Sequence, residues 1–159
     1  MIVKDIQDET LQDYKVVSML ISACSCDWKC CSEAGMDICQ NSELAQRKDA
    51  AIPNKVICRR YLHNPISKAI IFGGLEPMLQ LDDVLEILSI LRHENNCLDD
   101  VVIYTGYNEA EVADKLKALR KYKNIIVKFG RYRPNDTERY DEILGINLAS
   151  SNQYAKKIS

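Results

Sequence analysis

The residues best suited to chemistry in this chain are three cysteines and a glycine-rich turn. Cys26, Cys30 and Cys39 lie in one short stretch, and Gly73-Gly74-Leu75-Glu76-Pro77 follows one predicted strand later. A closed structural metal site takes four protein ligands, whereas three thiolates leave one coordination position for another molecule. The cysteines therefore predict a metal centre with a vacant position, which is typical of a reactive site rather than a structural one.

Length and composition predict one globular domain spanning residues 1–159. The chain has 159 residues, of which 47% are hydrophobic and 28% charged, and it is shorter than a complete eight-stranded barrel usually is. No apolar run approaches the ~18 residues of a membrane span, so we expect no membrane association. A formal net charge of −2 gives no general electrostatic reason to bind nucleic acid.

The amino-terminal residues and the cysteine content both favour a cytoplasmic location. Residues 1–8 are polar and acidic and lack the apolar core of a secretory signal. The seven cysteines are an odd number, and five of them crowd into positions 24–39, where oxidation would risk scrambled disulfides. We expect reduced thiols, some of which bind metal.

Hydrophobic periodicity predicts an α/β fold with a mainly parallel sheet. Apolar, β-branched runs alternate with segments of helical spacing, which is typical of right-handed strand–helix–strand units. Both motifs follow the carboxyl ends of predicted strands, where parallel sheets build binding sites, so we expect them to meet in space. The predicted strands are 16–21, 68–72, 101–105 and 124–129; the predicted helices are 43–47, capped by Asn41 or Ser42, one from Pro53-Asn54, one over 81–91, and one from a capping Asn108.

In these residues the chain resembles the radical S-adenosylmethionine (SAM) superfamily and, within it, the small activating proteins of anaerobic ribonucleotide reductase. The resemblance spans roughly residues 14 to 154. It includes Cys26-x3-Cys30, Cys39-Gln40-Asn41-Ser42-Glu43-Leu44, the turn at 73–77 with one residue inserted relative to the family's Gly-Gly-Glu-Pro, the strand Val101–Gly106, and Ala149-Ser150-Ser151-Asn152-Gln153.

The cysteine spacing departs from the family's pattern. Glu33 occupies the place where the third cysteine usually stands, so the assignment of Cys39 requires about six extra residues in the loop 24–41. We prefer Cys39 because Asn41 and Leu44 follow it as in the family. Vicinal cysteines would struggle to bind two corners of one cluster. Cys24 precedes the motif. We therefore interpret Cys24 and Cys31 as bystanders or as thiols that lie next to the ligands, although replacement of an assigned ligand by either of them stays open.

The resemblance implies a partial, open (β/α) barrel that binds a [4Fe–4S] cluster through Cys26, Cys30 and Cys39. In the family, SAM chelates the free iron and is cleaved reductively to methionine and a 5′-deoxyadenosyl radical. That radical takes a hydrogen atom from a glycine of the large reductase subunit. Loop amides, Trp28 and Lys29 are the candidates to tune the cluster potential.

The resemblance also implies which residues bind SAM. Gly73 and Gly74 would let the backbone approach the methionine end, and Glu76 would accept from its ammonium group. Ile38 would pack on adenine, while Asn41 and Thr105 would offer polar contacts. The simpler alternatives are a core-facing Ile38, a capping Asn41, a Thr105 that ends its strand, and an ordinary turn with an exposed Glu76.

The partners implied are the large glycyl-radical subunit of anaerobic ribonucleotide reductase and an electron donor of the flavodoxin or ferredoxin type. A chain this short has little material with which to enclose a small substrate, which favours a macromolecular one. Two alternatives stay open. One is a small radical SAM enzyme that acts on a small molecule or a peptide, and the other is a zinc-stabilised binding module in which a fourth cysteine closes the site.

Overall fold

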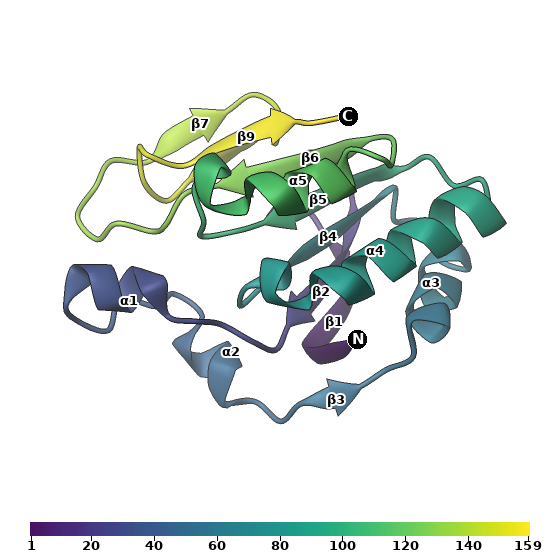
Figure 1. The fold of residues 1–159 in the computed structure, drawn as a ribbon, viewed down its shortest axis with the longest axis horizontal. Coiled ribbons are helices and arrows are strands. Elements are labelled where there is room, and N and C mark those ends of the chain that lie inside the picture. The colour runs from purple at the N-terminus through teal and green to yellow at the C-terminus, as the bar shows by residue number, and fades with distance from the viewer.

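The computed structural model describes residues 1–159 as an open sheet flanked by helices (Figure 1). The sheet has seven strands in the order β3-β1-β2-β4-β5-β6-β9, and a separate hairpin is formed by β7 and β8. The strands are β1 (Ile2–Thr10), β2 (Ser18–Ala23), β3 (Ala50–Ala51), β4 (Ala69–Gly74), β5 (Asp100–Tyr104), β6 (Ile125–Phe129), β7 (Arg139–Asp141), β8 (Ile146–Leu148) and β9 (Tyr154–Lys157).

The centre of the sheet is parallel and its edges are antiparallel. Strands β2, β4, β5 and β6 pair in parallel, and they are the four strands that the apolar runs predict. Strand β1 pairs antiparallel with β2 and β3, and β9 pairs antiparallel with β6. The α/β class is therefore confirmed, but the sheet is mixed and unclosed, and a partial barrel of the radical SAM type stays a prediction.

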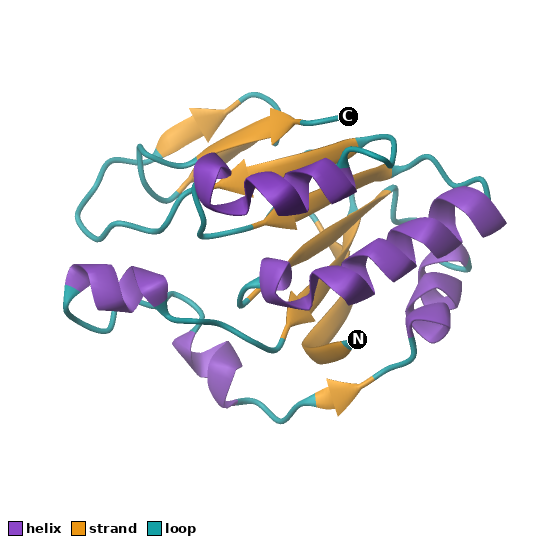
Figure 2. Cartoon of the chain, viewed as in Figure 1, coloured by secondary structure: helices purple, strands orange, loops and turns teal.

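One face of the sheet is covered by three α-helices and carries the main core (Figure 2). The helices are α3 (Asn54–Leu62), α4 (Leu81–Ser89) and α5 (Ala113–Leu119), with short turns η1 (Pro77–Gln80), η2 (Ile90–Glu94, a π-turn) and η3 (Glu109–Val112) at their ends. Helix α4 buries Val84, Ile87 and Leu88 at three- and four-residue steps, as its amphipathic pattern predicts. Asn108 and Glu111 form the capping box that begins η3, which confirms the predicted cap.

The other face of the sheet has no helix. A smaller apolar cluster covers part of it, and its side chains come from the central strands, from β9, from the β1–β2 loop and from the β7–β8 segment. The cluster consists of Tyr14, Ala69, Ile71, Val102, Ile126, Leu144, Leu148 and Ala155. This cover leaves the carboxyl ends of the central strands open on that side, and the cavity described below lies there.

Several expectations about local structure need correction. Residues 2–10, which look only polar and acidic, form the long strand β1. Residues 24–41 are not entirely loop, because Lys29–Ala34 form the short helix α1. Helix α2 spans Ser42–Gln46 with Asn41 at its N-cap position, but no side-chain capping bond is present. No helix of the structure combines the length and apolar character that crossing a membrane requires.

Candidate functional site

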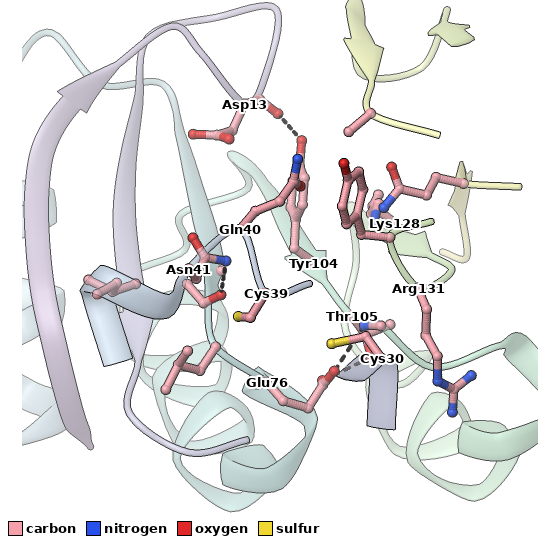
Figure 3. A pocket seen from close by; sticks show the side chains of 18 of the residues that line it. Asp13, Cys30, Cys39, Gln40, Asn41, Glu76, Tyr104, Thr105, Lys128 and Arg131 are labelled. Carbon is pink, nitrogen blue, oxygen red and sulfur yellow. Dashed lines mark hydrogen bonds between the residues drawn. The ribbon is translucent and has the colours of Figure 1, made fainter. Parts of the chain in front are cut away.

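A cavity of about 530 Å³ opens on the helix-free face at the carboxyl ends of the parallel strands. Of the seven cysteines, only Cys26, Cys30 and Cys39 line it. The six residues that the resemblance implies for SAM binding also line this cavity: Ile38, Asn41, Gly73, Gly74, Glu76 and Thr105. Figure 3 shows Cys30, Cys39, Glu76 and Thr105 around this one space.

The backbone around the first two cysteines is shaped by a single left-handed residue. Trp28 adopts φ 57° and begins helix α1, which carries Cys30 in its first turn. The same turn of the chain lets the Trp28 backbone N–H donate to Cys26 Sγ at 3.3 Å. Hydrogen bonds to a ligating sulfur help to set the potential of an iron–sulfur centre, so this amide lies where it would tune a cluster bound through Cys26.

Cys24 and Cys31 have other surroundings. Cys31 lies next to Cys30 with the two Sγ atoms 3.9 Å apart, and its thiol faces Asp37 Oδ1 at 3.5 Å. The Cys24 thiol contacts Ser25 Oγ at 3.3 Å. Neither residue lines the cavity, which is the arrangement expected if both are bystanders.

The donor set on the cavity wall fits a cluster with one free iron. Three thiols are present, and no fourth cysteine and no histidine lines the cavity. No three His, Cys, Asp or Glu side chains lie close enough together to hold a single metal ion. A cubane makes a different demand, because each thiolate binds its own iron at a separate corner and the ligands stand further apart than around one ion.

Burial keeps the three thiols protonated in the metal-free chain. Desolvation raises the pKa of Cys26 and of Cys39, and desolvation together with the neighbouring Cys31 raises the pKa of Cys30 to about 11. Thiolate, not thiol, is the metal ligand, so cluster assembly must release these protons.

The cysteine loop and the glycine-rich turn meet, as predicted from their positions after parallel strands. The Asn41 side-chain amide donates to the Gly74 carbonyl oxygen at 2.6 Å (Figure 3). The Glu76 backbone N–H donates to the Ser25 carbonyl oxygen at 2.7 Å. The Asn41 side chain therefore does not cap helix α2, although the residue occupies the N-cap position. It ties the third cysteine's segment to the end of β4.

The Glu76 carboxylate organises the turn after β5. It is buried, with only 5% of its surface exposed. Its Oε1 accepts from Thr105 Oγ1 at 2.9 Å and from the Met78 N–H at 3.0 Å, and its Oε2 accepts from the Gly106 N–H at 2.9 Å. Burial raises the pKa of Glu76, and these three donors oppose the rise. Thr105 thus does more than end its strand, and Glu76 is not an exposed turn residue.

The apolar wall next to Cys39 is provided by Ile38. This side chain is half-buried and belongs to neither apolar core cluster, so it is not the core residue of the simpler alternative. It lines the main cavity and a smaller neighbouring one. Its position leaves an apolar surface available to a planar ligand.

A network of charged and aromatic side chains around the cysteine loop was not predicted. Tyr107 Oη donates to Asp27 Oδ2 at 2.6 Å, and Lys29 Nζ lies 4.6 Å from the centre of the Tyr107 ring. Arg131 donates to both carboxylate oxygens of Glu111, at 2.6 and 2.8 Å. These contacts join the loop to η3 and to the segment after β6. The bonded residues are far apart in sequence, so no local pattern reveals them.

Glu33, the residue at the family's usual third-cysteine position, belongs to the same network. Its carboxylate lies 3.2 Å from Arg131 Nε, and 63% of its side chain is exposed. An ion pair this exposed contributes little to stability. The position that a cysteine would occupy in the family here holds a carboxylate that faces a guanidinium.

Replacing Tyr107 by phenylalanine is expected to loosen the cysteine loop. The change removes a hydrogen bond to a carboxylate, which is worth about 1.5–3 kcal/mol. We expect a lower unfolding free energy in urea and faster amide hydrogen exchange over residues 26–41. Tyr140→Phe is the control, because 61% of Tyr140 is exposed and its hydroxyl makes no bond. Equal effects of the two variants would contradict the role given to Tyr107.

The remaining histidines and cysteines have structural surroundings. His63 contacts the Arg59 carbonyl oxygen, and His93 contacts Ser89 and stacks near Tyr122. Cys58 is buried in the core, and Cys97 packs against it. None of them lines the cavity.

Comparison with known families gives one match. A model described as 4Fe-4S single cluster domain matches residues 15–154. The matched segment contains the three cavity cysteines, the Gly-Gly-Leu-Glu-Pro turn and the four parallel strands. Searches of curated proteins and of solved structures gave no match.

Proposed function

The chain belongs to the 4Fe-4S single cluster domain family, and on that premise we propose that it is a radical SAM activase. In this proposal Cys26, Cys30 and Cys39 hold a [4Fe–4S] cluster, SAM binds its free iron, and the product is a glycyl radical on the large subunit of anaerobic ribonucleotide reductase. A flavodoxin or ferredoxin supplies the electron.

One observation carries the proposal. Three thiols and the Gly-Gly-Leu-Glu-Pro turn line a single cavity, although forty or so residues separate them in the chain. A [4Fe–4S] cluster on three thiolates supplies a low-potential electron and an open iron, which is what reductive cleavage of SAM requires. The family match supports the cluster, and the resemblance in the residues around it supports SAM as the cosubstrate.

The side chains of the cavity suit the parts of SAM. Glu76 Oε2 accepts only one protein hydrogen bond, so it keeps the capacity to accept from an ammonium group. Gly73 adds no side chain between the strand end and a ligand. Ile38 offers an apolar surface for adenine, and Asn41 keeps the third cysteine's segment against Gly74.

The substrate we propose is a protein segment rather than a free small molecule. The cavity is bounded by the sheet, the cysteine loop and the β7–β8 segment, which leave one side of it open. An open cavity of this kind admits a glycine-bearing loop from a partner, whereas small-molecule sites bury most of the ligand surface.

Anaerobic reconstitution tests the proposal directly. With iron and sulfide, the protein is expected to turn brown, to bind about four irons, and to release 5′-deoxyadenosine when it is reduced in the presence of SAM. Addition of the large reductase subunit is then expected to give the electron paramagnetic resonance signal of a glycyl radical. A colourless protein that binds zinc through its cysteines would contradict the proposal. Release of 5′-deoxyadenosine without any glycyl radical would restrict it to the cleavage step.

A further inference from the structure

The lengthened cysteine loop builds a second cavity, of about 400 Å³, beside the first. One wall consists of residues that stand between the second and third cysteines: Glu33, Ala34, Met36 and Ile38. The opposite wall is the segment 131–134, which follows β6. The two cavities adjoin, since Cys30, Ile38, Arg131 and Tyr132 line both. The second cavity therefore depends on the stretch of loop that the family's usual cysteine spacing lacks.

Two residues that line the second cavity carry buried polar atoms without a hydrogen-bond partner. Arg131 is only 7% exposed, and its Nε makes no hydrogen bond. Asn152 donates from Nδ2 to the Arg131 carbonyl oxygen at 2.9 Å, but its Oδ1 is buried and accepts nothing. Nε can only donate and Oδ1 can only accept. Because an unpaired buried polar atom is costly to a fold, this pair needs a physical reason.

The Glu33 carboxylate holds the place of a ligand on Arg131. Its Oε1 lies 3.2 Å from Nε but accepts no hydrogen bond from it. The two terminal nitrogens of Arg131 are engaged by Glu111, at 2.6 and 2.8 Å, and Figure 3 shows the guanidinium directed away from Tyr104. The side chain of Glu33 is 63% exposed, and helix α1 buries no residue, so Glu33 can leave at small cost. A better acceptor can therefore displace it.

The unused donor and acceptor together favour a neutral peptide group as the ligand. A peptide group presents a carbonyl oxygen to Arg131 Nε and an N–H to Asn152 Oδ1. A carboxylate or phosphate would satisfy only the donor and would place an anion near the unpaired Oδ1. The rest of the wall suits a polypeptide as well, because Met36 is 62% exposed and its flexible side chain can adapt to what binds.

We propose that the second cavity binds the main chain of the protein substrate, with Arg131 Nε as donor, Asn152 Oδ1 as acceptor and Glu33 as the group that the substrate displaces. The identity of the occupant, the glycine-bearing segment of the large reductase subunit, rests on the proposed function. A glycine leaves its main chain unobstructed by a side chain. Because Cys30 and Ile38 line both cavities, a segment bound here lies next to the proposed cluster.

Binding of a main-chain probe to the whole chain tests the proposal. The probe is N-acetyl-triglycine N-methylamide, and its affinity is measured from the side-chain N–H resonances of Arg131 and Asn152. We expect Glu33→Ala to tighten binding by about two- to fivefold, because the probe no longer displaces a carboxylate. Arg131→Lys keeps the positive charge but deletes the Nε donor, so we expect it to weaken binding by about tenfold or more.

Two matched controls isolate these contacts. Glu94→Ala removes an exposed carboxylate of η2 that lines neither cavity, so it should leave the affinity unchanged. A probe whose central N–H is replaced by an ester oxygen should bind about three- to tenfold more weakly, because it cannot donate to Asn152 Oδ1. Equal affinity of Glu33→Ala and the unsubstituted chain, or no binding to either, overturns the proposal. Both arms stay decisive if Arg131→Lys does not fold.

The probe separates the cavity from the proposed function, because its binding needs no cluster and is decided even if reconstitution gives a colourless protein. The occupant is tested in the reconstituted protein. There, Glu33→Ala is expected to lower, by about two- to fivefold, the concentration of large reductase subunit that gives the half-maximal glycyl-radical signal. If the probe binds as expected and this concentration does not change, the reductase segment is not the occupant.

Discussion

Replacement of Cys39 by alanine is expected to abolish cluster binding and SAM cleavage, whereas replacement of Cys31 leaves both intact. Cys39 lines the cavity with Cys26 and Cys30, while the Cys31 thiol faces Asp37 outside it. Loss of one of three thiolates exposes a second iron and removes the geometry that a cubane needs. We expect bound iron to fall to background and 5′-deoxyadenosine release to fall by more than about 100-fold.

Iron and sulfide analysis, visible absorption and product chromatography check this result on anaerobically reconstituted variants. Cys24→Ala and Cys58→Ala extend the comparison, since one thiol borders the cysteine loop and the other is buried in the core. Equal losses in the Cys31 and Cys39 variants would contradict the ligand set. If Cys39→Ala retained iron and Cys31→Ala lost it, Cys31 rather than Cys39 would be the third ligand.

Replacement of Gly74 by alanine is expected to cause the largest loss of stability among single methyl additions at the site. Gly74 has φ +77°, and a Cβ there would lie 2.8 Å from Ser22 Cβ and 2.9 Å from Ser22 Cα. The left-handed conformation costs a non-glycine residue about 1–2 kcal/mol, and the overlap with β2 adds about 1–3 kcal/mol. The parallel pairing of β2 with β4 at this end should be disturbed, and the cavity with it.

Gly35→Ala is the matched control for backbone conformation. Gly35 has φ +67°, but a Cβ there meets no atom within 4 Å. Gly35→Ala should therefore lower the free energy of unfolding only by the cost of the left-handed conformation, about 1–2 kcal/mol. Urea unfolding of both variants measures the difference. If Gly74→Ala costs no more than Gly35→Ala, the close approach of β2 and β4 does not require a glycine.

The central strands could be predicted because they are buried on both faces. Residues 69–72 and 101–104 are apolar runs rich in β-branched side chains, and they lie in β4 and β5. The edge strands could not be predicted in this way, because they are not buried on both faces. Only Val3 and Thr10 of strand β1 are buried, and its exposed positions include Asp5, Gln7 and Glu9, so its sequence looks like a polar terminus.

The local structure of the cysteine loop could not be predicted from the sequence either. Helix α1 has no capping side chain, buries no residue and begins after a left-handed tryptophan, so none of the usual signals marks it. The position of the motifs after parallel strands was enough to predict that they meet. The bond that joins them, from Asn41 to Gly74, was not predictable, because Asn41 also suits a helix cap.

The cavity wall beyond the motifs depends on long-range contacts. Tyr107 and Arg131 reach the site from the turns after β5 and β6, and their partners Asp27 and Glu111 are distant in sequence. Lys128 lies within β6 and donates to the nearby Gly130 carbonyl oxygen. A lysine inside a strand pattern is the one local sign that could have been noticed. Its alternation with Val127 and Phe129 places it on a buried face.

The hydrogen bond received by the Cys26 sulfur comes from the main chain of residue 28, and this has an evolutionary consequence. Every amino acid except proline carries that donor, and proline is excluded by the positive φ of the position. The indole of Trp28 is 40% exposed and can be exchanged without touching the bond. In the proposed centre, sequence drift can thus remodel the surface presented to other proteins, while the contribution of this hydrogen bond to the cluster potential is kept with the shape of the loop.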